Sequence, residues 1–128
     1  MNQALSRVAR VSVMVLSRRA FSAPPAPVPH YILTYPYPPT ILEDRVPHRP
    51  GHVGLAKQHK AAGTLLYAGG LSSPLSSTSN RELPTEGVFL FNCEKAAEEF
   101  IEDDPYVKSG VVDRAGITIR EWACVVTP

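Results

Sequence analysis

The sequence predicts an α+β fold in which a small antiparallel sheet carries helices on one face. Two segments have the composition and spacing of helices, and four short apolar segments have the character of strands. Their order along the chain is strand, helix, strand, strand, helix, strand. This order is the split βαβ pattern of ferredoxin-like domains. With 128 residues and 44% hydrophobic content, the chain is long enough for one domain around a single core.

The first half of this pattern begins with a strand over residues 31–35, which are aromatic or β-branched and have prolines on both sides. A helix is predicted over 50–62, because Pro50 suits a first turn and Gly63 suits the left-handed position that ends a helix. The residues expected on its inner side are Val53, Leu55, Ala56 and His59. A second strand is predicted over 64–71, with Gly69 and Gly70 ending or bending it. Because this strand is mostly apolar, we expect it to be buried on both faces or against helices.

The second half starts after a polar, Ser-rich segment over 72–80, which predicts a loop. A third strand is expected over 87–91 and a second helix over 94–102. The apolar stripe of that helix consists of Ala96, Ala97, Phe100 and Ile101. The last strand is expected to begin at Val111, to be interrupted by a bulge or turn at 115–116, and to continue through 117–122. Since helices cover one sheet face only, we expect a second copy to cover the other, as a homodimer or a higher oligomer.

The first 22 residues have the composition of a mitochondrial transit peptide. They contain four arginines, several serines and no acidic residue. A secretory signal is the alternative, but the apolar run over 11–16 is short and is followed by Arg18-Arg19 where a small-residue cleavage site would be needed. We therefore expect import into the matrix and cleavage near Ser22. Residues 23–29 then form a Pro-rich linker, and residues 30–128 form the folded domain.

Charge and cysteine content exclude several classes of protein. The formal net charge is +1, but four of the positive charges lie in the leader, which leaves −3 for the remainder. A mildly acidic body without a basic cluster argues against nucleic-acid binding, and the apolar run in the leader is too short to span a membrane. Cys93 and Cys124 are too few for a disulfide framework and lack metal-site spacing, so we expect a residue near a helix cap and a buried strand residue.

The segment from Asp103 to Gly110 reads as a rigid corner. It follows an amphipathic helix, places an acid directly before Pro105 and ends on a glycine. Asp before Pro is also the pattern of an ordinary helix cap, in which the carboxylate accepts backbone N–H groups. A cap that uses one carboxylate oxygen leaves the other available for an imidazole. We therefore predict that Asp104 orients His52, whereas Asp103 is solvated.

Several segments resemble the YciI-like, or YCII-related, family of dimeric α/β-barrel proteins. They are Arg49-Pro50-Gly51-His52-Val53, the strand 65–70, Ala96-Ala97 and the corner 103–110, and the similarity extends over about residues 30–126. The resemblance implies a pocket that contains His52 and Asp104. It also implies a range of activities, because members include a dehydrochlorinase acting on a chlorinated hydroxyquinol and structural cousins include muconolactone isomerase. The leader, the proline-containing first loop and the Ser-rich insertion depart from the bacterial pattern.

The function predicted from these residues is a small-molecule pocket protein. His52 can act as a general acid or base, since imidazole titrates near neutral pH and a carboxylate partner fixes its tautomer. This would support elimination or isomerisation of a cyclic or aromatic acid with no cofactor. Arg49 can hold an anionic substrate or form a surface salt bridge, and Tyr106 either lines the pocket or, as we favour, packs beneath it. His48 and His52 are four residues apart, but Pro50 and Gly51 between them argue against a metal site. The alternative function is a non-catalytic ligand-binding or accessory module in which the pair only braces the helix start.

Overall fold

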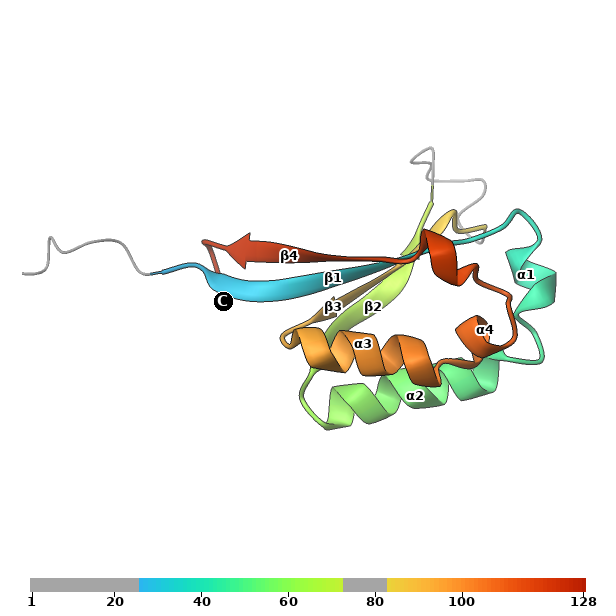
Figure 1. Ribbon diagram of the computed structural model, residues 1–128, viewed down its shortest axis with the longest axis horizontal. Coiled ribbons are helices and arrows are strands. Elements are labelled where there is room, and N and C mark those ends of the chain that lie inside the picture. Colours follow the sequence, from blue (N-terminus) through green and yellow to red (C-terminus); the bar gives the residue numbers. More distant parts are fainter. Residues whose placement is uncertain (1–25, 73–82) are drawn as a thin grey trace, which may run out of the picture.

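The computed structural model describes residues 26–72 and 83–128, which form one four-stranded antiparallel sheet with two long helices on a single face (Figure 1). The strand order is β2-β3-β1-β4. In chain order the elements are β1 (Val28–Pro36), α1 (Ile41–Asp44), α2 (Arg49–Ala61), β2 (Leu65–Leu71), β3 (Glu86–Phe91), α3 (Glu94–Asp103), α4 (Pro105–Lys108) and β4 (Thr118–Cys124). The predicted α+β class, with helices on one face of an antiparallel sheet, is confirmed.

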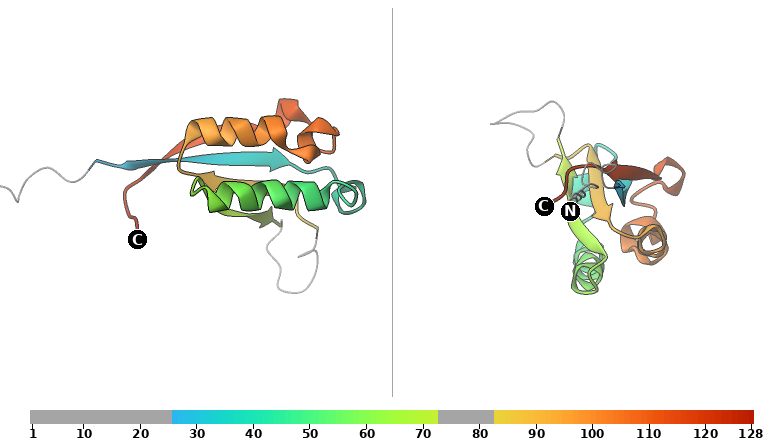
Figure 2. Two further views of the ribbon diagram at one scale, coloured as in Figure 1. Left: turned by 90° about the horizontal axis from the view of Figure 1, so that it is seen from below. Right: turned by 90° about the vertical axis from the view of Figure 1, so that its left-hand side faces the viewer.

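The core lies between the sheet and the helices α2 and α3, which run side by side beneath it (Figure 2). Side chains alternate between the two sides of a strand, so Leu33 and Tyr35 of β1 point toward the helices together with Phe89 and Phe91 of β3. The predicted stripe of α3 meets them, and all four of its residues are buried: Ala96, Ala97, Phe100 and Ile101.

Both long helices begin and end within one residue of the predicted limits. Pro50 lies in the first turn of α2, where its missing N–H costs no hydrogen bond. Gly63 follows the helix with φ +83°, a conformation that favours glycine. Helix α3 begins after Cys93, whose side chain makes no capping hydrogen bond.

Two strand limits differ from the prediction. Strand β1 begins at Val28 because this residue pairs with Cys124, so the strand extends into the expected linker. The prediction that β4 starts at Val111 is wrong. The Asp113 side chain accepts a hydrogen bond from the Ala115 backbone N–H and caps a short 3₁₀ turn at Arg114–Gly116, which delays the strand to Thr118. The expected transit peptide and most of the Ser-rich loop lie outside the described residues.

Strand β2 is more exposed than its sequence predicts. It continues through both glycines to Leu71, but only Leu65 is buried, and the Tyr67 side chain is 77% exposed. The reason is its place at the edge of the sheet, where it has one neighbouring strand instead of two. Tyr67, Leu71 and Trp122 give the sheet an apolar surface outside the core. In the described part of the chain, no helix has the length and hydropathy needed to cross a bilayer.

Candidate active site

His52 lies in the first half of α2 and is its buried residue, with 7% of its surface exposed. The close approach of α4 to this part of α2 makes the burial possible. Gly51 faces Pro105, whose Cγ would lie 3.0 Å from a Cβ added at that glycine. A residue without a side chain at position 51 therefore lets the start of α4 pack directly against the turn that carries His52.

Asp104 is the single residue that connects α3 to α4. Its backbone is extended, with φ −74° and ψ 124°, so α3 ends at this residue and α4 begins after it. The carboxylate is completely buried, and its Oδ1 accepts a hydrogen bond of 3.0 Å from the Tyr106 backbone N–H. Pro105 occupies the first helical position, where it needs no hydrogen-bond acceptor. The predicted cap is therefore present in the structure.

The two predicted residues meet although 52 positions separate them. The His52 Nδ1 atom lies 2.9 Å from both carboxylate oxygens of Asp104. The Tyr35 hydroxyl, which the sequence analysis did not select, donates to Oδ2 at 2.7 Å. Three groups, the Tyr106 N–H, the His52 ring and the Tyr35 hydroxyl, thus donate hydrogen bonds to one carboxylate. These bonds replace the hydration that a buried carboxylate loses. Because an ionised carboxylate only accepts, Nδ1 must carry the proton of this hydrogen bond, and Nε2 of the neutral ring is left with a free lone pair.

Burial, and after it the charge of the adjacent Asp104, raises the pKa of the Tyr35 hydroxyl far above its ordinary value of 10.0. Both causes disfavour a phenolate: the site removes solvent, and the carboxylate repels a second negative charge. Tyr35 therefore remains a hydrogen-bond donor across the physiological pH range.

Aromatic rings hold the imidazole in place. The Tyr106 ring is stacked on the His52 ring, with centroids 3.8 Å apart and planes within 2° of each other. Phe89 and Phe100 contact the imidazole edge-on, at centroid distances of 5.7 and 5.8 Å. Rotation of the ring away from Asp104 would disrupt these contacts. Tyr106 is itself 1% exposed and is not among the residues that line the cavity described next, so it supports His52 from beneath.

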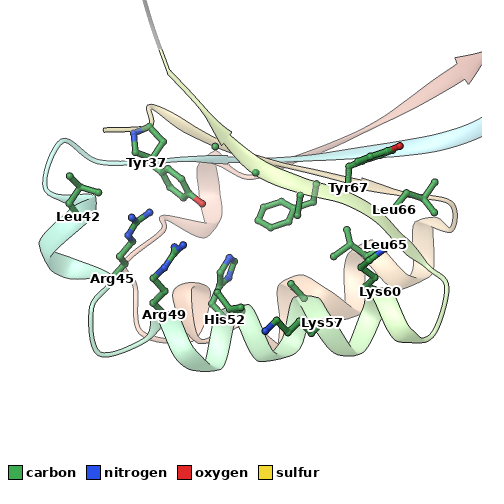
Figure 3. A pocket seen from close by; sticks show the side chains of 17 residues that line it. Tyr37, Leu42, Arg45, Arg49, His52, Lys57, Lys60, Leu65, Leu66 and Tyr67 are labelled. Carbon is green, nitrogen blue, oxygen red and sulfur yellow. The ribbon is translucent and has the colours of Figure 1, made fainter. Parts of the chain in front are cut away.

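A cavity of about 780 Å³ lies between α2 and β2, and His52 is part of its wall (Figure 3). Figure 3 shows the imidazole pointing from α2 into the space below the sheet, with Arg45 and Arg49 on one side of it and Lys57 and Lys60 on the other. The Tyr37 side chain reaches into the same end of the cavity as the two arginines. The volume is that of a site for a small organic molecule.

Among the described residues that line the cavity, the charged side chains are Arg45, Arg49, Lys57 and Lys60, and all four are cationic. Within residues 26–72 and 83–128, none of these four side chains forms an ion pair. Burial raises the pKa of the Tyr37 hydroxyl to about 12, although the two arginines act in the opposite direction. The arrangement favours an anion beside a neutral phenol donor.

The sequence analysis predicted the contact between His52 and Asp104, but it predicted only some of the residues that line the cavity. Arg49 lines the cavity, Tyr106 packs below His52, and Asp104 does not reach the cavity wall. His48 makes no side-chain capping hydrogen bond. Among the described residues, no cluster of three or more His, Cys, Asp or Glu side chains is arranged to hold a metal ion.

Five contributors were missed: Tyr35, Tyr37, Arg45, Lys57 and Lys60. For Tyr35 a signal was present, because it shares the inner face of β1 with Leu33, and a buried tyrosine hydroxyl needs a hydrogen-bond partner. Arg45 follows the short helix α1, which the sequence analysis did not predict, and no residue pattern pointed to its position.

Comparisons with known proteins show the family and the fold of the chain. Residues 29–123 match the family model described as the YCII-related domain. Among solved structures, the chain resembles the 5-chloro-2-hydroxyhydroquinone dehydrochlorinase TftG from Burkholderia phenoliruptrix AC1100, determined in complex with 2,5-dihydroxybenzoquinone. The TM-score is 0.58 at 19% sequence identity, over 73% of this chain and 92% of the dehydrochlorinase, a similarity that shows a shared fold. No curated protein matches the chain in sequence.

Proposed function

We propose that this chain, which belongs to the YCII-related domain family, is a small-molecule enzyme. In this proposal the enzyme uses His52 and Asp104 for proton transfer. The substrate class is a cyclic or aromatic acid, and the reaction is an elimination or isomerisation that needs no cofactor. One observation carries the proposal: the His52 imidazole is bonded to a buried carboxylate through Nδ1 while the same ring forms part of a cavity wall.

The chemistry follows from the position of the proton on the imidazole. With Nδ1–H directed at Asp104, the lone pair of Nε2 can remove a proton from a carbon next to a substrate carbonyl. The electron pair of the broken C–H bond then forms a C=C bond, and either a leaving group departs with its own electron pair or a proton returns to a different carbon. Asp104 stabilises the imidazolium formed in between, and the tight packing against Tyr106 holds the ring in one orientation.

The positive wall supports an acidic substrate. Arg45 and Arg49 lie beside His52, so an acid group held between them would place its neighbouring carbons near the imidazole. The name of the structurally similar dehydrochlorinase describes an elimination on a hydroxylated ring. At 19% identity this similarity does not transfer the substrate, but a cyclic compound and the removal of a leaving group are consistent with the cavity described above.

Proton exchange tests this proposal without knowledge of the product. A mixture of cyclic and aromatic keto acids is incubated with the full-length protein in D₂O, and NMR detects deuterium at carbons next to a carbonyl. We expect incorporation into at least one compound with the wild type and at least a hundred-fold slower exchange with His52→Ala. The matched control is His48→Ala, which removes an imidazole one turn earlier and should exchange like the wild type. Compounds that bind without exchange would instead support the non-catalytic binding module.

We also propose that the protein is a homodimer joined through the outer sheet face. Tyr67 and Leu71 on β2 and Trp122 on β4 are 77%, 52% and 49% exposed, and a sheet face that no helix covers and that bears exposed apolar side chains is a common interface. Sedimentation equilibrium should report a dimer for the wild type and a monomer for Trp122→Glu. Val46→Glu, at an exposed valine away from the sheet, is the control and should remain dimeric. A monomeric wild type would contradict this proposal.

The subcellular location is a separate proposal, which the composition of residues 1–22 supports. We expect import into the mitochondrial matrix and removal of the leader near Ser22. Amino-terminal sequencing of the protein recovered from mitochondria measures this directly, and an intact first residue would contradict it.

A further inference from the structure

One face of α2 forms the floor of the cavity and has a regular chemical pattern. The cavity-lining residues Arg49, Val53, Ala56 and Lys60 follow each other at intervals of four, three and four residues, which places them on one side of a helix. The two middle residues are apolar and the two end residues are cationic. A floor of this kind contacts an apolar molecule in its centre and charged groups at its ends.

The opposite wall is mostly apolar. It is formed by β2 from Leu65 to Gly70, together with Pro84 and the Phe89 ring of β3. An apolar wall that faces a helix with cationic residues at both ends favours an elongated molecule with an apolar centre.

The spacing of the charges relative to His52 is unequal. At a rise of about 1.5 Å per residue, Arg49 lies about 4.5 Å from His52 along the axis of α2, and Lys60 lies about 12 Å from it in the other direction. Arg45 and Tyr37 add to the near end, whereas Lys57 adds to the far end (Figure 3). The reacting atom of a ligand at His52 would thus be close to one cationic group and remote from the other.

We infer that the cavity binds an elongated dianion, with one acid group beside Arg49 and a second, remote acid group at Lys60. This deepens the proposed function, because it names the charge pattern of the substrate held at the same site. The four cationic side chains among the described residues of the cavity wall support a doubly negative ligand, because cations near one another repel each other until an anion is bound.

A matched pair of probes tests the remote contact. Biphenyl-4-carboxylate and biphenyl-4,4′-dicarboxylate share one rigid core and differ only in the second acid group. Calorimetric titration of the full-length protein at low salt should show that the dicarboxylate binds about five-fold more tightly, the factor that corresponds to one ion pair of about 1 kcal/mol. Added salt should reduce this ratio.

Variants identify the residues responsible. In Lys60→Met the two probes should bind equally, and Arg49→Met should weaken both. The control Lys108→Met changes an exposed lysine of α4 outside the cavity and should keep the five-fold ratio. Equal binding of the two probes to the wild type, or a ratio that persists in Lys60→Met, would overturn the inference.

The result of the binding test can be distinguished from the result of the proton-exchange test of the proposed function. Substitution of His52 by alanine should abolish proton exchange and leave the ratio of the two affinities unchanged. A preference for the dicarboxylate with no exchange of any compound would refute the enzyme and retain the dianion site. Exchange of monoacids with no preference for the dicarboxylate would support the enzyme and refute the dianion site.

Discussion

Removal of the Tyr35 hydroxyl is the sharpest test of the buried network. In Tyr35→Phe the ring keeps its packing, but Oδ2 of Asp104 loses a hydrogen bond of 2.7 Å in a site with no solvent access. Hydrogen bonds to charged groups contribute about 1.5–3 kcal/mol. We therefore expect the free energy of unfolding at pH 7 to fall by about 2 kcal/mol, measured by urea denaturation followed by circular dichroism.

The pH dependence of this difference provides a second measurement. Below pH 10 the Tyr35 hydroxyl is protonated in both the folded and the unfolded state, so its hydrogen bond contributes fully. Above pH 10 it ionises in the unfolded chain but not in the folded protein, where burial and Asp104 raise its pKa. The folded state then binds more protons than the unfolded state, so stability falls with rising pH. The advantage of the wild type over Tyr35→Phe should shrink by about 1.4 kcal/mol per pH unit above pH 10.

Tyr106→Phe is the matched control. It also removes a buried tyrosine hydroxyl, but that oxygen has no hydrogen-bond partner among residues 26–72 and 83–128. Its loss should change the free energy of unfolding by less than about 0.5 kcal/mol or raise it, since an unsatisfied buried polar group costs free energy. If both substitutions destabilise the protein equally, or if the Tyr35→Phe difference is constant up to pH 11, the reasoning about the carboxylate network is wrong.

Three further predictions concern the imidazole and two glycines. Asp104→Asn presents an amide N–H to Nδ1, so the proton of the His52 ring should move to Nε2. ¹⁵N NMR should then report the Nε2–H tautomer, and proton exchange should be lost. An unchanged tautomer would contradict the assigned hydrogen bond. Gly87→Ala places a Cβ 2.3 Å from the Tyr37 hydroxyl and should cost about 1–3 kcal/mol by thermal denaturation. Gly54→Ala has open space within α2 and should stabilise the protein by about 0.5–1 kcal/mol, and a loss of stability there would refute the helix argument.

The helices could be predicted from the sequence because their signals are local. Pro50 and Gly63 mark the two ends of α2, and the apolar stripe of α3 repeats at helical spacing. The exposure of β2 could not be predicted in the same way. Strand order decides which strand lies at the edge of the sheet, and no residue of β2 encodes that order.

The contact between His52 and Asp104 was predictable from residue type, whereas its environment was not. An Asp before Pro105 and a histidine early in a helix are recognisable patterns, but the contact between Tyr35 and Asp104 joins residues 69 positions apart. Such a contact exists only after the sheet and the helices have packed. The arginine of the cavity that follows α1 was missed for a similar reason, because α1 is too short to produce a periodic pattern.

Asp104 links the stability of the fold to the chemistry of the site. Its Oδ1 caps α4 through the Tyr106 backbone N–H, and the same carboxylate binds His52 and Tyr35. A substitution of Asp104 therefore changes the start of a helix and the state of the imidazole at once, and loss of activity in such a variant cannot be attributed to either alone. Tyr35→Phe leaves the cap intact. If proton transfer depends on the charge of the carboxylate, this variant should keep the Nδ1–H tautomer of His52 and exchange protons at a rate within ten-fold of the wild type, while it unfolds more easily.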